Sequence, residues 1–135
     1  DALVWNSTLN VLSKLCVVLS HGRGLDESKR TELTCALNGS VMGMVGEEER
    51  QHLMSNELTV DNVIKLMEAM LREAERRYYD DNDVALMPDV CTYNTVIGTI
   101  ARYHATENDG LKRIERYVQR MEMVEDGGES TVGEE

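Results

Sequence analysis

The chain has 135 residues, a length typical of one domain with a modest core. Its 25 acidic and 14 basic residues give a formal net charge of −11, which counts against binding to nucleic acid by charge alone. Its three cysteines lack metal-ligand spacing, so we expect no metal site and favour a reducing compartment.

The first predicted element is a helix over about residues 3–20. Apolar side chains recur there at alternating steps of four and three, which places them on one face of a helix. These are Trp5, Leu9, Leu12, Cys16 and Leu19. We expect this face to be buried, with Trp5 in the core because it begins the stripe.

Residues 21–57 form a long insertion with a less regular pattern. A glycine-rich turn opens it, and residues 27–37 and 47–54 can each form a helical segment. We expect an irregular and partly mobile loop.

A second helix is predicted over about residues 58–77, with Thr59 or Asp61 as its N-cap. Its apolar positions are Val63, Ile64, Met67, Met70, Leu71 and Ala74. A loop leads from it to Pro88 and Asp89, where proline prevents a helix from continuing.

A further pair of helices is predicted over residues 90–124. The first again has apolar spacing of four and three, and the second begins after a turn at 108–110. The first helix carries Tyr93, Ile97, Ile100 and His104, and the second Leu111, Ile114, Val118 and Met121. Residues 125–135 are rich in Gly and Glu and are predicted to be an acidic, disordered tail.

The beginning of the chain is repeated after residue 88. Aligning Asp1 with Asp89 pairs Trp5 with Tyr93, and the same register aligns asparagines, aliphatic residues and bases. The second helices also align, with Met70 opposite Met121. The chain therefore contains two copies of a helix-connection-helix unit, over residues 1–89 and 90–124.

These copies, and above all the segment Pro88-Asp89-Val90-Cys91-Thr92-Tyr93-Asn94-Thr95-Val96-Ile97, resemble the pentatricopeptide repeat family. The resemblance covers about residues 1–20, 58–77 and 88–123. It implies an all-α fold, an α-α superhelix or solenoid of antiparallel helical hairpins, here with an insertion in the first unit. Two units are fewer than the three or so that such arrays need, so we expect a piece of a longer array or a truncated product.

The family binds single-stranded RNA in a sequence-selective way, so the resemblance implies organelle RNA processing or expression in mitochondria or plastids. It assigns base recognition to the residue after the aromatic, Asn6 or Asn94, and to the residue that closes the unit, Asp89. The combination of Asn6 and Asp89 resembles the family's uridine-preferring pair. The same resemblance assigns base packing to Leu3 and Cys91 and phosphate contacts to Lys14 and Arg102.

Each of these residues has a structural alternative. The two asparagines and Asp89 are also good helix N-caps. Leu3 and Cys91 also suit packing between units, and Lys14 and Arg102 suit any exposed helix surface. The alternative for the whole chain is a helical-repeat scaffold for protein-protein interaction, which the acidic charge favours.

No enzymatic activity is expected. The three histidines lie in unrelated contexts, and no zinc-protease, phosphate-loop or nucleophile-elbow pattern is present. We therefore expect no catalytic residue, no cofactor and no small-molecule substrate. We also recognise no apolar run of membrane-spanning length and expect no membrane partner.

Overall fold

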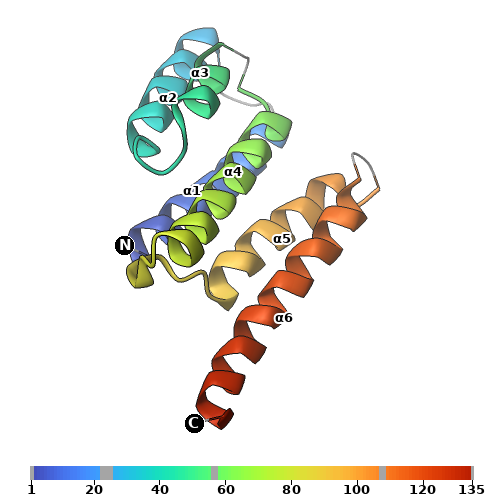
Figure 1. The fold of residues 1–135 in the computed structure, drawn as a ribbon. Helices are drawn as coiled ribbons and strands as arrows, with labels where there is room; N and C mark the ends of the chain where they lie inside the picture. Colours follow the sequence, from blue (N-terminus) through green and yellow to red (C-terminus); the bar gives the residue numbers. More distant parts are fainter. Residues whose placement is uncertain (1, 22–25, 56–57, 107–108, 135) are drawn as a thin grey trace.

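The computed structural model describes residues 2–21, 26–55, 58–106 and 109–134, and of these it leaves out the side chains of 54 and 125–134. The described chain is all-α, as predicted, and Figure 1 shows its helices packed side by side. They are α1 (Ala2–His21), α2 (Glu27–Ser40), α3 (Glu47–Ser55), α4 (Val60–Asp80), α5 (Val90–His104) and α6 (Gly110–Glu134), with a short 3-10 turn, η1 (Val84–Leu86).

Two helix pairs form the body of the molecule. Helix α1 packs against α4, and α5 packs against α6, while α5 also contacts both α1 and α4 (Figure 1). The whole predicted stripe of α1 is buried, and so are the apolar positions predicted for α4. The second pair therefore packs onto the first through α5, whose Tyr93, Val96 and Ile100 belong to the same hydrophobic core.

The insertion is more regular than the sequence indicated. The expectation of an irregular loop over 21–57 is wrong, because α2 and α3 pack together there and α3 packs against α4. Helix α2 begins at the N-cap Asp26, whose carboxylate accepts a hydrogen bond of 2.8 Å from the backbone N–H of Lys29. Buried Leu37, Val41 and Leu53 join the common core, so burial of apolar surface holds the insertion in place.

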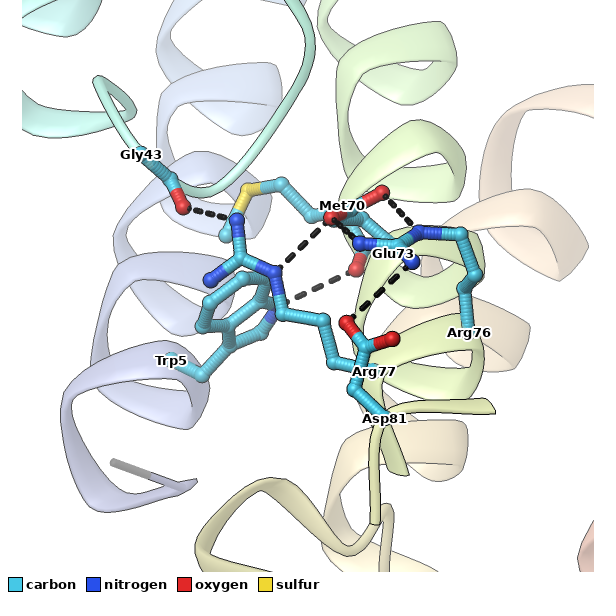
Figure 2. A network of polar contacts seen from close by, with 7 residues as sticks. All are labelled: Trp5, Gly43, Met70, Glu73, Arg76, Arg77 and Asp81. Atoms are coloured by element: carbon cyan, nitrogen blue, oxygen red, sulfur yellow. Dashed lines mark hydrogen bonds and ion pairs between the residues drawn. The ribbon is translucent and has the colours of Figure 1, made fainter. Parts of the chain in front are cut away.

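Trp5 connects α1 to α4 and to the insertion (Figure 2). Its indole N–H donates to the backbone carbonyl of Met70 over 3.1 Å, and the ring is only 4% exposed. The guanidinium of Arg77 lies over the ring, 5.4 Å from its centroid, and also donates to Glu73 and to the carbonyl of Gly43. Trp5 is therefore a core residue, as predicted. Arg77 connects it to Glu73 of α4 and to Gly43 of the insertion.

The C-terminal helix is longer than expected. Helix α6 continues to Glu134, where the sequence predicted a disordered tail over 125–135. Extending an existing helix requires no new nucleation, so a glycine-rich segment can continue it.

Helix α1 is long and apolar enough, by length and composition, to cross a membrane, whereas no apolar run of that length was expected from the sequence. Within the fold its buried stripe packs against α4 and α5. Core helices of soluble proteins pass the same test, so this property says little about location.

Candidate functional site

Helices α1 and α5 lie side by side and run in the same direction. Three polar contacts join them, and the residue numbers of the contacts rise together along the two helices. The contacts are Asn6 with Thr92 at 2.7 Å, Asn10 with Thr95 at 3.2 Å and Ser13 with Thr99 at 2.9 Å. The contacts join residues 85 or 86 positions apart, close to the 88-residue offset between the copies, so equivalent residues of α1 and α5 lie near one another. We call the surface that these two helices form together the α1–α5 face.

The predicted base-reading pair meets at the start of this face. Asn6 Nδ2 lies 3.5 Å from Asp89 Oδ1, and Asn6 Oδ1 accepts a hydrogen bond from the hydroxyl of Thr92. Asp89 also caps α5, because its carboxylate accepts from the backbone N–H of Thr92 over 2.9 Å and its own N–H donates to the Thr92 hydroxyl. The capping alternative for Asp89 is thus realised together with the contact to Asn6.

The amide of Asn6 keeps some capacity for a ligand. Its contact with Asp89 is at the long limit of a hydrogen bond, so it is weak and a base edge can compete with it. Asn6 and Asn94 are each the fifth residue of their helix, so neither is an N-cap.

The remaining predicted residues project from the same two helices. Leu3 is 75% exposed, and Cys91, Asn94, Lys14 and Arg102 are exposed as well. Because Leu3 and Lys14, like Cys91 and Arg102, are eleven residues apart, each pair lies on one side of its helix about three turns apart. Exposure of Leu3 and Cys91 argues against the alternative that they pack between these two units.

The α1–α5 face differs in charge from the rest of this acidic protein. Neither helix contains an aspartate or a glutamate, and Asp89 adjoins α5 only as its N-cap. The insertion's Glu48 and Glu49 instead line a cavity with residues of α4. Within the described chain, Lys14 and Arg102 are the Lys and Arg side chains of this face, and Asp89 is its carboxylate.

The polar contacts between α1 and α5 were not predicted from the sequence. Thr92, Thr95 and Thr99 recur at steps of three and four, a spacing that places three hydroxyls on one side of α5 and was a usable signal. Thr92 and Thr99 are each only 3% exposed, so this side of α5 is buried against α1.

The three cysteines differ in their exposure. Cys16 is buried, and burial raises the pKa of its thiol to about 12, whereas Cys35 and Cys91 are exposed. Among the described residues, no group of three or more His, Cys, Asp or Glu side chains could hold a metal ion.

Comparisons of the chain with protein-family models, with curated proteins and with solved structures found no match. The resemblance to pentatricopeptide repeats therefore stays an interpretation of the repeated residues.

Proposed function

We propose that the α1–α5 face binds single-stranded RNA in a sequence-selective way. The observation that carries the proposal is the meeting of Asn6 with Asp89 on a face whose two helices contain no carboxylate. An asparagine amide both donates and accepts hydrogen bonds, which matches the edge of a pyrimidine. Lys14 and Arg102 would contact phosphates and position the strand without selecting its sequence.

The resemblance stated above supports the same proposal and its cellular setting. We propose that the chain belongs to a pentatricopeptide-like solenoid acting on organelle transcripts in mitochondria or plastids. Leu3 and Cys91 would pack against base faces, for which an exposed apolar side chain is suited.

Nuclear magnetic resonance tests the proposal on this chain, because it detects weak binding. Oligouridine should shift the side-chain amide signals of Asn6 and Asn94 and the backbone signals of α1 and α5, more strongly than oligoadenine does. Replacing Asn6 with Ala should remove the preference for uridine. The matched control is Asn10→Ala, which removes an asparagine that contacts Thr95 from the same helix and should leave the preference intact.

Two results would refute RNA binding at this face. One is the lack of any RNA-dependent shift in α1 and α5 at low salt, where phosphate contacts are strongest. The other is an unchanged uridine preference in the Asn6→Ala variant.

A second candidate is a protein-binding helical scaffold. It is favoured by the net charge of −11 and by three exposed valines on α1, spaced by seven residues: Val4, Val11 and Val18, each 44–59% exposed. Replacing Val11 with Ser should abolish partner binding in a scaffold, whereas it should leave RNA-induced shifts unchanged. The same variant thus separates the two functions.

A further inference from the structure

A second charged site lies away from the α1–α5 face. A cavity of about 430 Å³ opens between α4, the end of α5 and α6. Five of its lining residues are Lys or Arg and two are carboxylates, so its walls carry an excess of three positive charges in a protein of net charge −11. We call it the α4–α6 cavity.

The floor of the cavity is a network of hydrogen-bonded side chains centred on buried Glu68 and His104. Glu68 is 8% exposed and accepts hydrogen bonds from Arg113 at 2.9 Å and from the Tyr117 hydroxyl at 2.8 Å. Arg113 also contacts His104 Nδ1 at 3.1 Å. Because arginine can only donate, His104 Nδ1 is the acceptor and Nε2 carries the proton that bonds Asp61 at 2.6 Å. Both carboxylates of the cavity are therefore already engaged.

The rim carries charges that remain available. Lys65 and Arg72 lie seven residues apart on one side of α4, and Arg116 faces them from α6. All three are exposed, and none forms an ion pair with a carboxylate in the described part of the chain. Glu48 and Glu49 share a neighbouring cavity with Lys65 and Arg72 without forming such a pair. The rim cations are thus the groups that a bound anion would neutralise.

From this geometry we propose that the α4–α6 cavity binds a small phosphate-bearing anion, of the size of a di- or triphosphate. Guanidinium groups form paired hydrogen bonds with phosphate oxygens, and an ammonium adds a point charge. The buried floor holds Arg113 in a fixed position, so the ligand would meet a preorganised wall and a movable rim.

The surroundings of the cavity favour a compact anion over a nucleic-acid strand. Asp61 lies among the lining residues, and Arg120 is already paired with Glu75 at 3.1 Å. Asp109 and Glu115 share a neighbouring cavity with Arg116, so a strand continuing past the rim would approach carboxylates. The positive region therefore covers a few phosphates and does not continue as a track.

Titration calorimetry of the chain with pyrophosphate and with tripolyphosphate tests the proposal. The wild type should bind both saturably, and the double variant Arg72→Gln, Arg116→Gln should lose at least about tenfold in affinity, because two charge-assisted contacts are removed. Both residues are exposed, so the variant should keep its circular dichroism spectrum. Lys29→Gln is the control, since it removes an exposed cation of α2 that does not line the cavity, and it should change neither titration.

The outcomes separate this proposal from RNA binding. The proposal is overturned if the wild type binds neither probe, or if Lys29→Gln weakens binding as much as the cavity variant does. It is also overturned if the cavity variant loses affinity for oligouridine but not for pyrophosphate, because the cavity is then part of an RNA surface. Retained pyrophosphate binding with no RNA binding would leave this proposal standing and refute the proposed function.

Discussion

The buried ion pair of Glu68 and Arg113 offers the sharpest test of the packing between α4 and α6. The side chains are 10% and 14% exposed, and the closest atoms are 2.9 Å apart. We consider Arg113→Met, which keeps a long side chain but removes the charge. It leaves the Glu68 carboxylate buried with the Tyr117 hydroxyl as its remaining donor among the contacts described above.

The expected magnitude follows from two opposing effects. With charge centres about 4 Å apart and an effective dielectric constant of about 20, the attraction is about 4 kcal/mol. Burial of each ion costs several kcal/mol, so the intact pair adds little net stability. Removing Arg113 leaves the cost of burying the Glu68 charge without the attraction that offsets it. We therefore expect Arg113→Met to lower the free energy of unfolding by about 3–5 kcal/mol.

Urea unfolding, followed by circular dichroism and by the fluorescence of the single tryptophan, Trp5, measures this change. The double variant Glu68→Gln, Arg113→Met should be more stable than Arg113→Met by about 1–3 kcal/mol, because no charge is then buried and Gln still accepts from Tyr117. The control is Arg120→Met. Arg120 is 43% exposed in its pair with Glu75, so its loss should cost less than about 1 kcal/mol.

The reasoning is refuted if Arg113→Met and Arg120→Met cost the same. It also fails if the double variant is no more stable than Arg113→Met, because the penalty would then not arise from an unpaired buried carboxylate.

Two further predictions concern titratable groups. Hydrogen bonds from Arg76, and then from Arg77, lower the pKa of Glu73 from its ordinary 4.5 to about 2, so its stabilising effect is complete above about pH 4.5 and is lost as the pH falls towards 2. The gap between the urea midpoints of wild type and Glu73→Gln should close over that range, and a constant gap from pH 7 to pH 2 would contradict the assignment. At pH 8 a thiol reagent should label exposed Cys35 and Cys91 at once and buried Cys16 only after unfolding, and immediate labelling of all three would show that α1 is not packed as described.

Local patterns in the chain were sufficient to predict much of the fold. The buried face of α1 and that of α4 follow from apolar spacing, because helical periodicity depends only on neighbours within a few turns. The 88-residue offset between Asp1 and Asp89 similarly predicted that α1 and α5 are equivalent, and the two helices do lie side by side.

The candidate site was predictable only in part. The resemblance to pentatricopeptide repeats pointed to Asn6, Asp89 and Asn94, and the first two do meet. The Thr92 hydroxyl that accompanies them was not foreseen, because its contact with Asn6 joins residues 86 positions apart. Whether these residues read RNA is a prediction that the binding experiments address.

Long-range packing accounts for what the amino-acid order did not reveal. The insertion folds because Leu37, Val41 and Leu53 find apolar surface on the first helix pair, and no pattern within 21–57 describes that surface. In the same way, the floor of the α4–α6 cavity depends on the hydrogen bond between Arg113 and Glu68, which lies 45 positions earlier in the chain. Spacing along the chain specifies which face of a helix is apolar. Which helix covers that face, and which charges lie opposite each other, depends on how the helices pack in space.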